Sequence, residues 1–239
     1  MANKKYYNMH TRQEEFLYKF IEKIGCMSFW QARYVLTEYY GCNQKQAEKV
    51  IMSLGKKRYF KFIDEQRFLR ANSLLDNSKL DMNMIIALSA ALEKCHITQE
   101  VESITSDSGQ DHQLSFIADN SLYYVLKLPS KSKDFMPKMF LAKNNFLQNA
   151  KIIAKNGNKQ VFGYTTLFVF SSDADIDDTL DTIAELELEM PHEIYFAKPG
   201  ELYDRIEFER FAEDDSDEDG DYDFDDDYDE DDADDEDLD

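Results

Sequence analysis

Three consecutive segments near the start of the chain carry the same signals for the beginning and the end of a helix. Each begins with a short polar residue that can cap the helix and has Glu or Gln three positions later, as in a capping box: Thr11 and Glu14, Ser28 and Gln31, and Asn43 and Gln46. Each ends near a glycine suited to the left-handed conformation that follows many helices: Gly25, Gly41 and Gly55. Apolar residues recur at helical spacing between these signals. The chain is therefore predicted to begin with three amphipathic helices.

After the third predicted helix the pattern changes to that of a β-hairpin. Residues 59–63 and 67–70 are typical of strands, and the Asp-Glu-Gln link between them is typical of a turn. Three helices followed by a hairpin resemble the winged-helix arrangement, and the resemblance covers residues 11–71. The predicted organisation is a flexible N-terminus at residues 1–10 followed by a winged-helix domain at residues 11–75.

The resemblance implies a surface that binds double-stranded DNA. In winged-helix proteins the third helix enters the major groove and the hairpin contacts the DNA backbone. Asn and Gln amides suit adenine, whereas Lys suits guanine or phosphate. The predicted DNA-binding residues are Asn43, Gln44, Lys45, Gln46, Lys49, Lys56, Lys57, Arg58, Lys61 and Arg67. Glu48 on the same helix argues against DNA because it would face phosphate, so protein docking and a purely structural role stay open as alternatives.

Residues 76–212 combine the patterns of helices and strands, which predicts an α/β domain. The expected elements are an apolar helix over 80–95, strands over 98–104, 113–118 and 122–128, a helix that starts at Pro137, a strand over 161–170, a helix over 176–190 and a strand over 193–197. The first six follow the order α-β-β-β-α-β, which resembles the restriction-endonuclease-like core. The overall fold class is α+β.

A winged helix followed by such a core resembles the replication-relaxation proteins of Gram-positive plasmids and other mobile elements, over residues 11 to about 200. The resemblance implies an acidic residue at the end of the second strand and an acid-x-Lys pattern on the third. Asp119 matches the first acid and Lys127 the lysine, but Val125 stands where the second acid belongs. One carboxylate is too few to hold a divalent metal ion, so the endonuclease-like site is predicted to be vestigial. No catalytic residue, metal or cofactor is expected, and the domain is interpreted as a scaffold for a homodimer or a protein partner.

The C-terminal segment, residues 213–239, contains twenty Asp or Glu residues and no Lys or Arg. Residues 1–70 have the opposite character, with fourteen Lys or Arg residues against seven Asp or Glu, a net charge of +7. So much like charge with so few apolar side chains predicts a disordered tail. Such a tail could cover the basic N-terminal region of its own chain, or bind a basic protein or a polymerase.

The predicted function is non-enzymatic DNA binding by a regulator or replication accessory of a mobile element, modulated by the acidic tail. The alternative is a protein-binding modulator or DNA mimic, such as an RNA polymerase accessory factor that acts through the tail. Three cysteines without C-x-x-C spacing are typical of reduced thiols, and no apolar run approaches the ~20 residues that a membrane span needs. The expected location is the cytoplasm, with no membrane partner.

Overall fold

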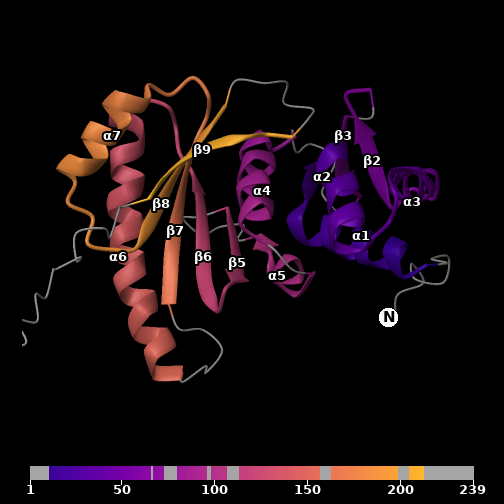
Figure 1. Ribbon diagram of the computed structural model, residues 1–239, viewed down its shortest axis with the longest axis horizontal. Coiled ribbons are helices and arrows are strands. Elements are labelled where there is room, and N and C mark those ends of the chain that lie inside the picture. Colours follow the sequence, from indigo (N-terminus) through magenta and orange to yellow (C-terminus); the bar gives the residue numbers. More distant parts are fainter. Residues whose placement is uncertain are drawn as a thin grey trace, which may run out of the picture.

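The computed structural model describes residues 11–65, 67–72, 80–95, 98–106, 113–156, 163–198 and 205–212. The predicted flexible N-terminus and the predicted acidic tail lie outside these residues. Within them the chain is a mixed α+β structure with a three-stranded sheet and a six-stranded sheet (Figure 1).

Residues 11–72, which we call the N-terminal unit, contain the three predicted helices and the predicted hairpin. The elements are α1 (Arg12–Ile24), β1 (Cys26–Ser28), α2 (Phe29–Tyr34), the π-helical turn η2 (Val35–Tyr39), α3 (Gln44–Lys56), β2 (Phe60–Ile63) and β3 (Phe68–Ala71). The sheet is antiparallel with the order β1-β3-β2. The sequence did not predict β1, which is only three residues long and pairs with β3.

The predicted helix starts are confirmed. Ser28 and Asn43 both form complete capping boxes, and the Thr11 side chain accepts a hydrogen bond from the backbone N–H of Glu14. Gly25 caps the end of α1 with a φ of 93°, and Gly41 has a φ of 65°. These local signals work because each one satisfies backbone groups that a helix end leaves without partners.

The predicted role of Gly55 as a left-handed cap is wrong. Gly55 lies inside α3, and the left-handed residue that follows this helix is Arg58, with a φ of 61°. A Cβ atom at residue 55 would lie 2.8 Å from Cζ of Phe62, so the glycine leaves room for that ring of the hairpin to pack against the helix. Close packing, and not backbone conformation, requires glycine here.

The rest of the described chain, residues 80–212, forms a second unit around the six-stranded sheet. The elements are α4 (Met82–Lys94), α5 (Thr98–Ser103), β4 (Thr105–Ser106), β5 (Leu114–Ala118), β6 (Ser121–Lys127), α6 (Ser132–Asn156), β7 (Gly163–Phe170), α7 (Ile176–Glu185), β8 (His192–Ala197) and β9 (Phe208–Ala212). The strand order is β4-β5-β6-β7-β8-β9, with parallel pairing within β6-β7-β8 and antiparallel pairing elsewhere. Helices α6 and α7 cover one face of the sheet, and α4 covers the other (Figure 1).

Several predictions for this unit need correction. The predicted strand over 98–104 is helix α5, and only the two-residue β4 follows it. Pro137 lies inside α6, which already begins at Ser132. The predicted helix over 176–190 ends at Glu185, and the edge strand β9 was not predicted. None of the described helices is both long and apolar enough to cross a membrane.

The central strands are buried on both faces. Along β7, Phe168 and Phe170 belong to the core under α6 and α7, whereas Leu167 and Val169 belong to the core under α4. This alternation follows from the two-residue period of a strand, and layers on both faces explain why β7 reads as a continuous apolar run.

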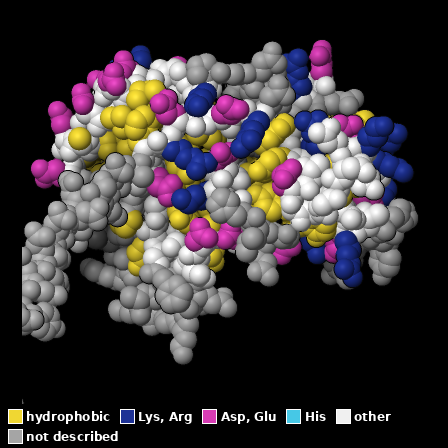
Figure 2. Space-filling model, in the orientation of Figure 1, with side chains coloured by type: hydrophobic (Ala, Val, Ile, Leu, Met, Phe, Trp, Pro, Cys, Tyr) yellow, Lys and Arg dark blue, Asp and Glu magenta, His cyan; other side chains and the backbone are white. Residues whose placement is uncertain are grey.

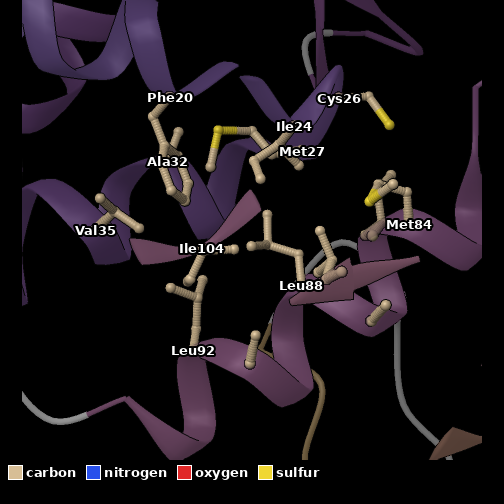
Figure 3. Close-up of a cluster of buried hydrophobic side chains, with 14 of the residues drawn as sticks. Phe20, Ile24, Cys26, Met27, Ala32, Val35, Met84, Leu88, Leu92 and Ile104 are labelled. Atoms are coloured by element: carbon tan, nitrogen blue, oxygen red, sulfur yellow. The ribbon is translucent and has the colours of Figure 1, made fainter. Parts of the chain in front are cut away.

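The core under α4 continues into the N-terminal unit. Leu88 and Leu92 of α4 face Ile24, Met27 and Val35 of the N-terminal unit, and all five are at most 3% exposed (Figure 3). The two units therefore share one hydrophobic core.

Buried and half-buried hydrogen bonds reinforce this junction. The side-chain amide of Gln31 in α2 donates to the carbonyl oxygen of Ile85 at 2.7 Å and to Oγ of Ser89 at 2.8 Å, both in α4. The hydroxyl of Tyr39 donates to the carbonyl oxygen of Cys95 at 2.7 Å. These directed bonds fix the orientation of the N-terminal unit on α4, because the buried Gln31 amide and the half-buried Tyr39 hydroxyl would otherwise lose these partners.

Candidate nucleic-acid interface

Helix α3 carries half of the predicted DNA-binding residues, and its capping box already uses two of them. The side-chain oxygen of Asn43 accepts from the backbone N–H of Gln46 at 2.9 Å, and the side-chain oxygen of Gln46 accepts from the N–H of Asn43 at 3.0 Å. Bidentate pairing with adenine needs both the oxygen and the nitrogen of an amide. Asn43 and Gln46 are therefore held as helix caps, and Gln44 is the exposed amide of this turn that has no part in the box.

Three exposed lysines line the outer face of α3. Lys45, Lys49 and Lys56 lie opposite the buried Ala47 and Ile51. Among the described residues no carboxylate forms an ion pair with any of these three lysines. We call Lys45, Lys49 and Lys56 the α3 cation stripe. Dark blue side chains gather at the end of the molecule where Figure 1 places α3 (Figure 2).

The acidic residue on this helix is partly neutralised. A carboxylate oxygen of Glu48 lies 3.7 Å from a guanidinium nitrogen of Arg33 in α2, and both side chains are partly exposed. Glu48 therefore opposes phosphate binding less than an unpaired carboxylate would, because Arg33 supplies an opposite charge beside it.

Lys57 is not part of this surface, although it was predicted to be. Its ammonium lies 2.8 Å from a carboxylate oxygen of Glu14, whose side chain is only 6% exposed. The same oxygen accepts a hydrogen bond from the Ser53 hydroxyl at 2.6 Å. Lys57 therefore holds α1 against the end of α3, and its charge serves the fold.

The remaining predicted cations lie on and before the hairpin. Arg58, Lys61 and Arg67 are exposed, and a guanidinium nitrogen of Arg67 lies 4.0 Å from a carboxylate oxygen of Asp64 in the turn. The structure thus brings the α3 cation stripe and the hairpin cations into one N-terminal unit.

The left-handed backbone at Arg58 gives a prediction that separates its charge from its conformation. Arg58→Gly should stabilise the chain by about 0.5–1 kcal/mol relative to Arg58→Ala, because glycine adopts a positive φ without the steric cost of a Cβ atom. Urea unfolding of the two variants measures this difference. Since both remove the same charge, they should bind DNA equally, and unequal DNA binding would mean that the backbone of this turn contacts the ligand.

The two endonuclease-like residues are far apart. Asp119 lies in the turn before β6 with a φ of 48°, and Lys127 is the last residue of the same strand. The ends of this seven-residue strand are about 20 Å apart at ~3.3 Å per residue. Asp119 and Lys127 therefore do not meet at one site.

Polar residues other than Asp119 surround Lys127. The side-chain oxygen of Gln113 accepts from the backbone N–H of Lys127 at 2.6 Å, and the buried ammonium donates to the carbonyl oxygen of Leu128 at 2.6 Å and to Oγ of Ser171 at 3.1 Å. Burial lowers the pKa of the Lys127 ammonium, against an opposing effect of Asp173. No group of three His, Cys, Asp or Glu side chains suited to a metal ion occurs within the part of the chain that the structure describes.

Asp173 completes this polar cluster at the ends of β6 and β7. The Ser130 hydroxyl donates to its carboxylate at 2.7 Å. Hydrogen bonds from Ser130 and Ser171 hold the pKa of Asp173 below its usual value. The cluster gives the buried Lys127 polar surroundings, and the sequence had no signal that would place Gln113, Ser171 and Asp173 around this lysine.

Comparisons with known proteins give no relative from which a role could be transferred to these residues: no family model matches the chain, and no curated protein or solved structure shows significant similarity to it.

Proposed function

We propose that the chain is a non-enzymatic protein that binds double-stranded DNA through a winged helix formed by residues 11–75. The observation that carries this proposal is the α3 cation stripe, three exposed lysines on one helix face that have no acidic partner among the described residues. A row of unneutralised lysines on a helix attracts the phosphates of a nucleic acid.

The arrangement around the stripe supports the same proposal. Helix α3 is followed by the antiparallel pair β2 and β3, as a recognition helix is followed by a wing. Gln44 and Lys45 are exposed in the first turn of α3, where base edges would be read, and Arg58 and Lys61 would contact the backbone beside them. Asn43 and Gln46 would help only indirectly, by fixing the start of the helix.

For the second unit we propose a scaffold of restriction-endonuclease-like order that has lost catalysis, in a cytoplasmic regulator or replication accessory of a mobile element. The separation of Asp119 from Lys127 and the amide of Gln113 beside Lys127 support a role without metal-assisted cleavage. The scaffold would serve a homodimer or a protein partner, and the acidic tail would modulate DNA binding.

The proposal is tested by removing two lysines of the stripe in the full-length chain. Lys45→Gln with Lys49→Gln should weaken binding to random duplex DNA on the order of tenfold and lower the salt slope by about 1.8, or about 0.9 per lost phosphate contact. Fluorescence anisotropy over a salt series measures both quantities.

The matched control is Lys131→Gln with Lys133→Gln, which changes the net charge equally at two exposed lysines beside the start of α6. It should leave both quantities near those of the parent chain. Equal losses in the two double variants would show a general charge effect and refute the α3 interface. No binding by the parent chain at low salt would favour a protein partner instead.

A further inference from the structure

Two adjoining hollows lie on either side of Tyr40 in the N-terminal unit. The larger, of about 460 Å³, is lined by residues of α1 together with Tyr40 and Glu102 of α5. The smaller, of about 350 Å³, lies between the start of α1 and α3 and includes Gln46, Lys49 and Val50. Tyr40 lines both hollows, and Lys49 of the α3 cation stripe lines the smaller one.

The larger hollow combines aromatic rings with cations. The rings of Phe16 and Tyr40 lie 4.7 Å apart at an interplanar angle of 41°. Arg12, Lys19 and Lys23 also line this hollow. Such a surface suits an aromatic group that carries negative charge beside it.

Two acidic residues, Glu15 and Glu102, line the same hollow, and both contact its lysines. Glu15 lies 2.7 Å from Lys19, and the Lys23 ammonium donates to the backbone carbonyl oxygen of Glu102 at 2.7 Å. Three cations against two carboxylates leave the lining of the larger hollow with net positive charge. In the smaller hollow Lys49 accompanies Glu14, whose carboxylate is paired with Lys57.

The C-terminal segment of the same chain has the complementary chemistry. Tyr222, Phe224 and Tyr228 are its three aromatic residues, and each has Asp on both sides. An extended chain places alternate side chains on one face, so Tyr222 and Phe224 would point the same way about 7 Å apart. This segment therefore offers aromatic rings flanked by carboxylates to a hollow of aromatic rings flanked by cations.

Contacts connect the start of this segment to the hollows. Ala212, the last described residue, pairs with Glu193 in the sheet, and Glu193 lies 2.7 Å from the ammonium of Lys94. The next residue, Cys95, accepts the hydrogen bond from Tyr39, the neighbour of Tyr40. Fully extended, the ten residues from Ala212 to Tyr222 span up to about 35 Å and the sixteen to Tyr228 up to about 55 Å.

We propose that residues 221–229 dock into the two hollows around Tyr40, with their aromatic rings against Phe16 and Tyr40 and their carboxylates against Arg12 and Lys49. Docking covers Gln46 and Lys49 and so competes with a ligand of the α3 cation stripe. That competition rests on the proposed DNA-binding function, whereas the docking itself does not. The acidic segment is then a specific ligand of its own chain. Its aromatic residues make contacts that non-specific electrostatic attraction would not need.

A photo-cross-linking experiment on the full-length chain tests the docking. With p-benzoylphenylalanine in place of Phe224, irradiation should give cross-links within one chain to peptides that contain α1 or residues 40–50. The matched control places the same probe at Ala233, which is also flanked by Asp on both sides but has no aromatic neighbours. The proposal is overturned if residue 224 gives no cross-links, or if its cross-links map to other peptides or join two chains. It is also overturned if the probe at residue 233 gives the same cross-links.

A second measurement isolates the aromatic contribution to DNA binding. The triple change of Tyr222, Phe224 and Tyr228 to Ser leaves the charge of the segment unchanged. At an effective segment concentration of about 1 mM and a docking constant of similar size, half of the molecules are closed, so release should raise DNA affinity about twofold or more. An unchanged affinity in a chain that does bind DNA refutes the competition. If neither the parent chain nor the triple variant binds DNA, the proposed function fails, and the cross-linking result alone tests the docking.

Discussion

Replacing Leu88 with alanine is expected to destabilise both units of the chain together, by about 3–4 kcal/mol. Leu88 is fully buried in α4, in the cluster that joins the N-terminal unit to the six-stranded sheet (Figure 3). Truncation of a buried leucine loses its transfer free energy and leaves a cavity, which together cost about 2–5 kcal/mol. Because the cavity opens between the units, neither keeps its stability.

Urea unfolding with two probes measures this effect. Trp30, the single tryptophan of the chain, stacks on Tyr34 at 4.7 Å between ring centroids and reports on the N-terminal unit, and circular dichroism reports on all helices. Both midpoints should fall by the same amount. The control Leu141→Ala removes the same atoms from a side chain that is 43% exposed, and should change stability by less than about 0.5 kcal/mol. A Trp30 midpoint that stays fixed in Leu88→Ala would show that the N-terminal unit is stable alone.

The second large effect is expected at Lys57. Lys57→Ala should destabilise the chain by about 2 kcal/mol, because it leaves the buried carboxylate of Glu14 without its cation. Breaking a fully buried pair costs about 3–5 kcal/mol, and partial exposure of the Lys57 side chain reduces that figure. The measurement is again urea unfolding of the full-length chain.

The neighbouring Lys56 supplies the control, because it has the same chemistry but belongs to the α3 cation stripe. Lys56→Ala should change stability by less than about 0.5 kcal/mol and lower the salt slope of DNA binding by about 0.9, whereas Lys57→Ala should leave that slope unchanged. Glu14→Met with Lys57→Met should recover much of the lost stability, since apolar replacement of both partners removes the unpaired charge. If Lys57→Ala lowers the salt slope and Lys56→Ala does not, Lys57 faces the ligand and the assignment is wrong.

Local signals in the sequence were sufficient for much of the N-terminal unit. The capping residues Ser28 and Asn43 and the glycine Gly25 predicted the helix ends, because each acts on backbone groups within a few residues. The apolar faces of α1 and α3 followed from helical periodicity alone. The exposed positions of Lys45 and Lys49 followed in turn, because the opposite face of α3 is apolar.

Segments whose conformation depends on packing were not predictable in this way. Residues 98–104 contain β-branched side chains typical of a strand, yet most of this segment is the helix α5. Val101 in this helix and Ile104 directly after it are both fully buried, three residues apart, so one side of a helical turn buries both. Contacts from β5 decide this outcome, and tertiary packing overrides propensity when a segment is short.

In the candidate site, too, some features followed from the sequence and others only from tertiary packing. The sequence by itself determined which segments are basic and which is acidic, where α3 starts and which of its faces is apolar, because charge and periodicity are properties of the chain. Only the tertiary structure decided that Lys57 turns inward to Glu14, that Asn43 and Gln46 are occupied as caps, and that Phe16, Tyr40 and Glu102 meet around a hollow. These outcomes depend on distances between residues far apart in the chain, which the shared core fixes and no local pattern encodes.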